Sequence, residues 1–349
     1  MIWMKIRDKI LPVPVIQGGM GVGVSLSKLA GAVAKCGGMG IVSAVNCGFN
    51  EPDFDKDPLQ ANLRALKREI RKAKEIAEGN GLVGVNIMAA VTNYDAYCAC
   101  AVEAGADAII SGAGLPLSLP EHTKGTDTLC APIVSSAKAA VILCRKYEKK
   151  YGILPDFFVM EGKMAGGHLG FSEDDLINGT EKTNDEIFLE IREALKEYDI
   201  PVFVAGGVFT GEDVKHFLAL GAAGVQIGTR FIATEECDAD EVFKKVIVNA
   251  KKEDIRIIKS PVGMPARAIV SPLLERIGTG EAFPAKRCSN CLTKCKKGDR
   301  IPYCISRALI EAVRGNWEDG LFFTGENADR IDRIQTVREL MDELYQMGE

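Results

Sequence analysis

The chain has 349 residues, of which 47% are hydrophobic, and it carries 43 basic against 48 acidic residues. Its net charge of −5 lacks the basic excess by which proteins bind nucleic acid. No apolar run approaches the roughly 18 residues that a membrane-spanning helix needs, and no signal peptide is evident. The eleven cysteines, an odd number, fall mostly in predicted core elements and indicate reduced thiols. We therefore expect a cytoplasmic protein with no nucleic-acid or membrane partner.

Short apolar runs that end in glycine alternate with helical patterns over residues 1–237. The expected strands are Val13–Ile16, Gly40–Ala44, Leu82–Ile87, Ala108–Ser111, Ala131–Val134, Phe157–Met160, Pro201–Ala205 and Gly224–Ile227. The expected helices are Leu26–Lys35 with Ser25 as N-cap, Leu59–Ala77, Tyr94–Ala104, a helix from Ser135 to about Lys150, Asp185–Glu197 and Thr210–Leu220. Such alternation requires parallel strands with right-handed crossovers, and eight units favour a closed (β/α)₈ TIM barrel. An open doubly wound sheet is the alternative.

The pattern changes at about residue 238. Helices are predicted at Glu241–Lys252, Ile301–Arg314 and Ile331–Leu344, with a cysteine cluster and proline-rich joins between them. We therefore expect two domains, a barrel over residues 1–237 and a C-terminal helical subdomain over residues 238–349 that leans on it.

The last two predicted barrel strands both end in glycine, at Gly206-Gly207 and at Gly228-Thr229. In (β/α)₈ enzymes the loops after strands seven and eight often hold a phosphate, and backbone N–H groups there need no lysine to do so. The alternative is that these glycines only turn tight corners. A mononucleotide fits better than a dinucleotide, because no G-x-G-x-x-G motif opens a helix with an acidic residue about 20 positions later.

The stretch from Pro155 to Phe171 is the expected centre of the chemistry. It predicts a short buried strand that ends on Glu161, followed by a glycine-rich loop that carries His168. A histidine near its unperturbed pKa of about 6.5 is a candidate general base, although it could instead cap a tight turn. For His122, in the loop after the fourth strand, and for His216, on a helix, we favour a surface position.

Five segments resemble the nitronate monooxygenase (2-nitropropane dioxygenase-like) family, to which the flavin-dependent enoyl-ACP reductases are related. They are Pro14–Met20 (PVIQGGM), Gly84–Met88 (GVNIM), Glu161–His168 (EGKMAGGH), Ala205–Gly207 (AGG) and Gly224–Arg230 (GVQIGTR), with weaker similarity at Gly320–Gly325 (GLFFTG). The resemblance covers roughly residues 10–235. Its motifs are specific for the superfamily and separate its members poorly.

The resemblance implies a barrel with FMN at its top. Residues Gly206, Gly207, Gly228 and Thr229 would bind the phosphate, while Gly18, Gly19, Met20, Asn86 and Lys138 would line the isoalloxazine and ribityl chain. Glu161 falls on an acidic position of the family, Gln226 lies in the last motif and is expected at the cofactor, and His168 matches the catalytic histidine. A solvated helix residue is the alternative for Lys138.

Two features depart from the family pattern. Lys163-Met164 precede Ala-Gly-Gly-His, where the family often has an acidic or small polar residue, so the pocket wall differs. Four cysteines, Cys288, Cys291, Cys295 and Cys304, are spaced as possible ligands of an iron–sulfur cluster or of zinc, and free thiols are the third alternative.

We therefore expect an FMN-dependent oxidoreductase of the nitronate monooxygenase type, which oxidises alkyl nitronates or reduces its flavin with NAD(P)H. A flavin-dependent enoyl-ACP reductase of fatty acid synthesis and a non-catalytic barrel that binds a phosphate ligand are the rivals. The expected partners are a small substrate, either a nitronate or an enoyl thioester, and a second copy of the chain in a homodimer.

Overall fold

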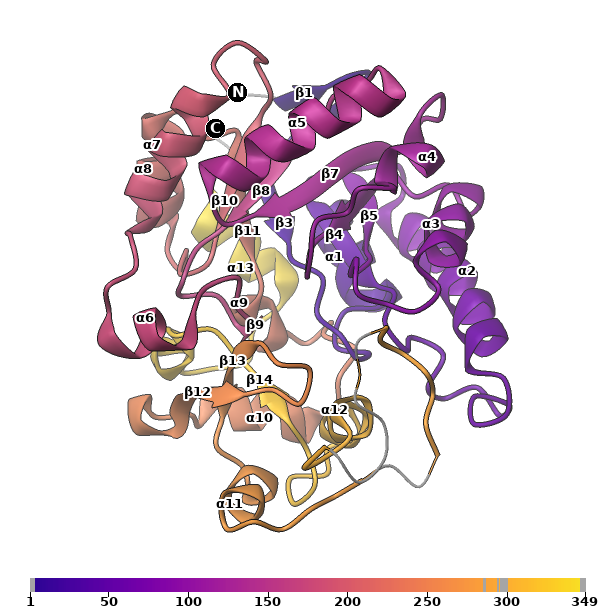
Figure 1. Cartoon of the computed structure of the whole chain (residues 1–349), viewed down its shortest axis with the longest axis vertical. Coiled ribbons are helices and arrows are strands. Elements are labelled where there is room, and N and C mark those ends of the chain that lie inside the picture. The colour runs from indigo at the N-terminus through magenta and orange to yellow at the C-terminus, as the bar shows by residue number, and fades with distance from the viewer. Residues whose placement is uncertain (1–3, 285–286, 294, 296–300, 346–349) are drawn as a thin grey trace.

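The computed structural model describes residues 4–284, 287–293, 295 and 301–345, and at its centre eight parallel strands close into a barrel (Figure 1). In barrel order the strands are β10 (Val202–Ala205), β11 (Gly224–Ile227), β3 (Val15–Gln17), β4 (Met39–Ser43), β5 (Leu82–Asn86), β6 (Ala108–Ser111), β7 (Leu129–Val134) and β8 (Phe158–Glu161). The predicted (β/α)₈ barrel is confirmed, and each predicted strand lies within one or two residues of the observed one. The open sheet is excluded.

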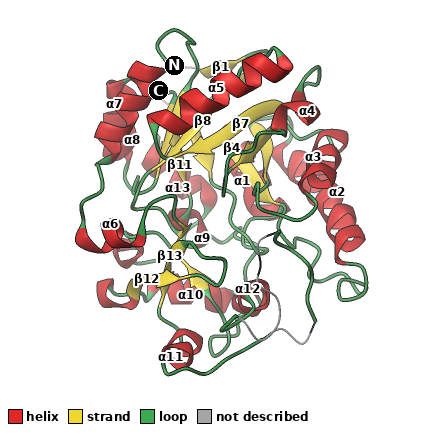
Figure 2. Cartoon of the chain, in the orientation of Figure 1, coloured by secondary structure: helices red, strands yellow, loops and turns green. Residues whose placement is uncertain are grey.

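Helices surround the strands, as the red and yellow ribbons of Figure 2 show. Those that follow barrel strands are α1 (Ser27–Lys35), α2 (Pro58–Ala77), α3 (Tyr94–Glu103), α4 (Leu119–Thr123), α5 (Ala137–Tyr151), α6 (Glu173–Asn178), α7 (Asn184–Ala194), α8 (Gly211–Leu220) and α9 (Thr229–Ile232). Strands covered on both faces read as continuous apolar runs, which is why these eight could be found from sequence.

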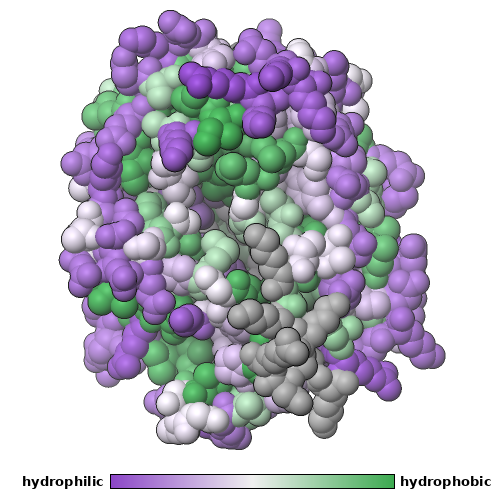
Figure 3. All heavy atoms as spheres, viewed as in Figure 1, coloured by the Kyte–Doolittle hydropathy of each residue, from purple (hydrophilic) through white to green (hydrophobic). Residues whose placement is uncertain are grey.

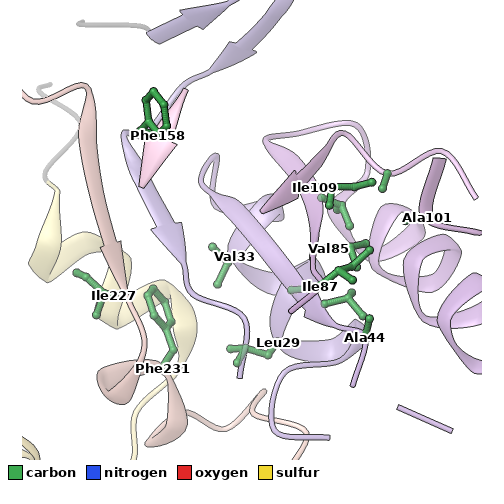
Figure 4. Packing of buried hydrophobic residues seen from close by; sticks show 14 of the residues in the cluster. Leu29, Val33, Ala44, Val85, Ile87, Ala101, Ile109, Phe158, Ile227 and Phe231 are labelled. Atoms are coloured by element: carbon green, nitrogen blue, oxygen red, sulfur yellow. The ribbon is translucent and has the colours of Figure 1, made fainter. Parts of the chain in front are cut away.

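Two apolar layers result from this arrangement. Outward-facing Val85 and Ile109 pack with Leu29 of α1 and Ala101 of α3 (Figure 4). A second buried cluster, which includes Ile41 and Phe203, fills the barrel interior. Both layers leave the carboxyl ends of the strands free for polar side chains.

The N-terminus of α1 is capped by a residue that lies far away in the sequence. The carboxylate of Asp238 accepts hydrogen bonds from the backbone N–H groups of Leu26 (2.7 Å), Lys28 (3.3 Å) and Leu29 (3.2 Å). The expectation that Ser25 is the N-cap is wrong. Ser25 Oγ instead accepts a hydrogen bond from Met20 N at 2.8 Å and so shapes the glycine loop after β3.

A hairpin that the sequence reading missed precedes the barrel. Strands β1 (Met4–Ile6) and β2 (Lys9–Leu11) pair antiparallel, and Ile6 and Leu11 join the interior cluster. The same cluster holds Met39 and Leu82, at the amino ends of their strands. The hairpin therefore closes the barrel at the amino ends of its strands, the end opposite the predicted site.

The region beyond residue 238 contains helices, as expected, together with a small sheet. Its helices are α10 (Glu241–Val248), α11 (Pro272–Gly278), α12 (Ile305–Val313) and α13 (Val337–Leu344), with 3₁₀ turns at Lys252–Asp254 and Ala328–Arg330. Its strands are β12 (Ile255–Lys259), β13 (Pro265–Ile269) and β14 (Phe322–Phe323). Strand β9 (Gly167–His168), from the loop after β8, pairs antiparallel with β13. The predicted catalytic loop is thus part of the C-terminal sheet.

Helix α13 returns to the barrel and packs beside α1 and α8. Its buried residues Leu340, Met341 and Leu344 belong to the same hydrophobic cluster as the outer face of the barrel. The segment after residue 237 therefore completes the helix layer as well as covering the site. Within the described part of the chain, no helix is both long and apolar enough to cross a membrane.

Candidate active site

A cavity of about 280 Å³ opens at the carboxyl ends of the barrel strands, beneath the C-terminal sheet and α12. Most predicted cofactor residues line it, together with the predicted catalytic histidine: Gly18, Gly19, Met20, Asn86, Glu161, His168, Gly206, Gly207, Gln226, Gly228 and Thr229. On the face drawn in Figure 3, hydrophilic residues follow the outer edge and less polar residues occupy the middle. The structure thus brings together predicted residues from five barrel strands or the loops that follow them.

The glycine corners after β10 and β11 lie on one side of the cavity. Gly206 and Gly207 have φ of +86° and +98°, a conformation that side chains disfavour. A Cβ at Gly206 would lie 2.7 Å from the backbone oxygen of Gly162, and one at Gly207 would lie 2.9 Å from Met164 Sδ. Both positions therefore require glycine, and their backbone is left open to a ligand.

A C-terminal segment fastens both corners. Gly325 N donates to Thr229 Oγ1 at 2.8 Å, and Asn327 Nδ2 donates to the carbonyl oxygen of Gly207 at 3.0 Å. The segment Thr324–Asn327 lines the cavity. It continues the weak motif at Gly320–Gly325, which was the one sequence signal for this part of the site.

The loop after β3, the barrel neighbour of β11, forms the adjacent wall. A Cβ at Gly19 would lie 2.3 Å from Asn86 Cβ, so glycine lets the loop approach β5 closely. Gln226 lies against Gly18, and its Oε1 is buried without a hydrogen-bond partner in the described structure. A buried amide oxygen without a donor costs free energy, and a ligand donor in the cavity would satisfy it.

His168 is half-buried on β9, where its main chain pairs with Ala266. Its Nε2 lies 2.8 Å from Ser260 Oγ, and its ring meets the ring of Phe323 edge-on, with centroids 5.3 Å apart. Burial lowers the pKa of His168 to about 4. The imidazole is therefore neutral at pH 7, and it is a weaker base than a histidine with the unperturbed pKa of about 6.5 that the sequence analysis assumed. Ser260 lies in the connection between β12 and β13, 92 residues after His168, so its contact with His168 could not be predicted from the sequence.

Glu161 ends β8 and lines the same cavity. Burial raises the pKa of its carboxyl to about 7. The part of the chain that the structure describes gives this carboxyl no hydrogen-bond partner and no cation. Proton uptake or release at Glu161 therefore falls in the neutral pH range, and this makes it the second titratable group of the site.

Arg267 holds the loop between Glu161 and His168 in place. Its guanidinium donates to the carbonyl oxygens of Lys163 (2.7 Å) and Ala165 (2.6 Å) and pairs with Glu326 at 3.2 Å. The residue is only 7% exposed. Through these three hydrogen bonds, the buried guanidinium of Arg267 links β13, the histidine loop and the Thr324–Asn327 segment.

Lys138 does not join this group. It lies in the first turn of α5, is exposed, and is absent from the cavity wall. Helix α5 runs along the outside of the barrel, and its inward face is taken by apolar residues. The structure therefore agrees with the alternative interpretation of Lys138, a solvated helix residue.

The metal site at the four C-terminal cysteines stays a prediction. Among the described residues, no three histidine, cysteine, aspartate or glutamate side chains are grouped to hold a metal ion. Cys288 is exposed, Cys291 lies on the cavity wall, and Cys304 precedes α12. Burial raises the pKa of Cys291, and the electrostatic influence of Cys304, Cys295 and Cys288 raises it further. The neighbouring Lys294, Lys296 and Lys297 lie outside the described residues.

The other two histidines lie on the surface side, as expected. His122 Nε2 lies 2.9 Å from Asp95 Oδ1, and His216 Nε2 lies 2.8 Å from Asp185 Oδ2. Neither lines the cavity.

A family model described as nitronate monooxygenase matches residues 5–347. The chain belongs to the nitronate monooxygenase family. It is therefore an oxidoreductase of that family, as the sequence motifs predicted.

Two named proteins resemble this chain over different shares of its length. A (3aS,4S,5R,7aS)-5-hydroxy-7a-methyl-1-oxo-octahydro-1H-indene-4-carboxyl-CoA dehydrogenase from Mycobacterium tuberculosis is 23% identical, covering 95% of this chain and 91% of the relative. A probable nitronate monooxygenase from Bacillus subtilis is 27% identical over 55% of this chain and 51% of its own length.

Two solved structures superpose well. FabK from Thermotoga maritima has a TM-score of 0.73 and 26% identity, covering 96% of this chain and 92% of its own. A nitroalkane oxidase from Streptomyces ansochromogenes has a TM-score of 0.72, covering 96% of this chain and 95% of its own. At 22% identity, the second bears on the fold alone.

The departure from the family motif changes the cavity wall at one position. Met164 lines the cavity beside Gly207, whereas Lys163 does not. Lys163 Nζ instead donates to the carbonyl oxygen of Glu181 at 2.7 Å. A thioether, and not the lysine ammonium group, therefore lines the cavity beside Gly207.

Proposed function

We propose that this protein is an FMN-dependent oxidoreductase that oxidises alkyl nitronates, or that takes electrons from NAD(P)H to reduce its flavin. The observation that carries the proposal is the cavity wall itself. It joins the corner after β10, where Gly206 and Gly207 admit only glycine, to the Gly228 corner after β11 and to an unpartnered buried amide oxygen, Gln226 Oε1. This wall suits a ligand with a phosphate at one end and hydrogen-bond donors further along.

The residues present fit a flavin mononucleotide. Gly206, Gly207, Gly228 and Thr229 would hold the phosphate, since exposed backbone N–H groups bind anions. Asn86, Gln226 and the Gly18–Met20 loop would hold the ribityl chain and ring. Bound there, the cofactor would supply two-electron redox chemistry, which no side chain of the cavity provides.

The protein's own groups bind the substrate, orient it and control protons. Neutral His168 presents a hydrogen-bonding nitrogen to the cavity, and Glu161 exchanges a proton near pH 7. Apolar residues on the remaining walls, among them Val22, Val45 and Leu309, exclude water. Electrostatic and hydrogen-bond interactions are stronger in such surroundings than in water.

An enoyl thioester reductase is the second candidate. The apolar walls from α10 and α12, which include Phe243, Ile305 and Leu309, leave room for an acyl chain. The likeness to FabK, at 26% identity over nearly the whole chain, also favours it.

The deciding experiment exposes the purified protein without oxygen to NADH, NADPH and propionate-3-nitronate in parallel, and records flavin bleaching. Bleaching by the nitronate supports nitronate oxidation. Bleaching by a nicotinamide, with recovery on addition of an enoyl thioester, supports the second candidate. A protein that releases no flavin on denaturation would instead favour a non-catalytic phosphate-binding barrel.

Replacing the histidine tests its part in either reaction. We expect His168→Asn to lower kcat by about 100-fold or more while the flavin absorbance is retained, because positioned acid–base or hydrogen-bonding groups contribute on the order of 10²–10⁴-fold. Steady-state rates would measure this. Unchanged rates would remove His168 from the mechanism.

A further inference from the structure

Ser260 supplies the hydrogen-bonding partner of the cavity histidine. It directly follows β12 and is 2% exposed. Its backbone is fixed by a tight turn, in which Ser260 N donates to Met264 O at 3.0 Å and Gly263 N donates to Ser260 O at 2.9 Å. His168 is held one strand away by its pairing with Ala266. Both partners of the 2.8 Å contact are thus placed by the same small sheet.

The direction of this hydrogen bond follows from the proton count. A serine hydroxyl has one proton to donate and two lone pairs that accept. Val262 N donates to Ser260 Oγ at 3.5 Å, which uses one lone pair. Within the described chain, the hydroxyl proton has one acceptor in reach, His168 Nε2. A buried hydroxyl that donates to nothing is unfavourable, so Oγ–H donates and Nε2 accepts.

The other ring nitrogen is then the donor. A neutral imidazole carries one proton, and a hydrogen bond accepted at Nε2 places that proton on Nδ1. The described residues offer Nδ1 no partner, and His168 is one of the residues that line the cavity. An N–H group is therefore left for whatever the cavity binds.

We propose that Ser260 is a positioning residue that locks His168 in the Nδ1–H form, so that His168 acts as a fixed hydrogen-bond donor to an anionic substrate oxygen. The use of this donor rests on the proposed function, while the tautomer does not. Nitronates and the enolates of thioesters both carry negative charge on oxygen, so the donor serves either candidate reaction. A preorganised donor stabilises such charge without reorganising during the reaction.

The tautomer can be measured directly, because the chain contains only three histidines. Long-range ¹H–¹⁵N spectra of the ¹⁵N-histidine-labelled holoprotein at pH 7 distinguish Nδ1–H from Nε2–H, and His168→Asn assigns the signal. We expect Nδ1–H in the wild type and a shift towards Nε2–H in Ser260→Ala. A wild-type Nε2–H signal, or an unchanged signal in Ser260→Ala, would overturn the assignment.

Kinetics test the consequence. Ser260→Ala should lower kcat roughly tenfold with a smaller change in KM, and Ser260→Thr, which keeps the hydroxyl, should recover most of the loss. Ser271→Ala is the matched control, since Ser271 is equally buried but donates to Gly320 O at 2.7 Å, away from the cavity. Equal kcat in Ser260→Ala and wild type would refute the donor role. If the tautomer is found but no substrate bleaches the flavin, the proposed function fails while the tautomer stands.

Discussion

Glu161 and His168 share one cavity, and burial moves their pKa values in opposite directions, to about 7 and about 4. Desolvation disfavours the charged form of each group, so at pH 7 the imidazole is neutral while the carboxyl is near its midpoint. Groups whose surroundings separate their protonation in this way are typical of acid–base sites. Glu161 is thus the residue of the site whose charge changes within the neutral pH range.

The raised pKa of Glu161 predicts a specific dependence of stability on pH. Its stabilising contribution is fully present below the unfolded-state pKa near 4.5 and is lost as pH rises through about 7. We expect Glu161→Gln to gain stability relative to wild type between pH 5 and pH 8, by at most about 3 kcal/mol. Urea unfolding of flavin-free protein at several pH values measures this difference. A difference that does not change with pH would contradict the assigned shift.

The loop between β8 and β9 takes its conformation from contacts with distant elements. Arg267 of β13 donates to its carbonyl groups, Glu326 N donates to the carbonyl oxygen of Met164 at 3.1 Å, and β9 pairs with β13. The sequence of the loop indicates a glycine-rich turn that presents a histidine, which the structure agrees with. The loop sequence does not indicate these partners, because they lie a hundred residues or more further along the chain.

Removing the guanidinium tests the role of this element. Arg267→Met keeps the length of the side chain but leaves two carbonyl groups and Glu326 without their donor. We expect a loss of about 2–4 kcal/mol in the free energy of unfolding, together with weaker flavin retention. Arg276→Met is the matched control, since Arg276 pairs with Asp319 at the surface, where an ion pair contributes little to stability. Comparable losses in both variants would show that Arg267 has no special role.

For the whole molecule, the barrel could be predicted because its strands are buried apolar runs that end in or near glycine. The positions of Glu161, His168, Gly207 and Gly228 could be predicted too, because these residues lie at the strand ends or in the loops that follow.

The hairpin β1–β2 and the sheet β12–β13–β14 were missed, since such short strands have no sequence pattern of their own. Asp238, Ser260 and Arg267 act through tertiary contacts and could not be found either. For Lys138, in contrast, the family resemblance predicted a place at the cofactor, whereas the side chain is exposed on α5 and does not line the cavity.

The central claim is that the glycine corners after β10 and β11 bind the phosphate of FMN. Its most direct test measures the flavin released on denaturation from wild type, Gly207→Ala and Gly152→Ala. Gly152 also has positive φ, but a Cβ there meets nothing within 4 Å, so it controls for backbone strain alone. We predict about one FMN per chain in wild type and Gly152→Ala, and little in a folded Gly207→Ala, as checked by circular dichroism. Absence of flavin from the wild type, or equal FMN in all three proteins, would contradict the claim.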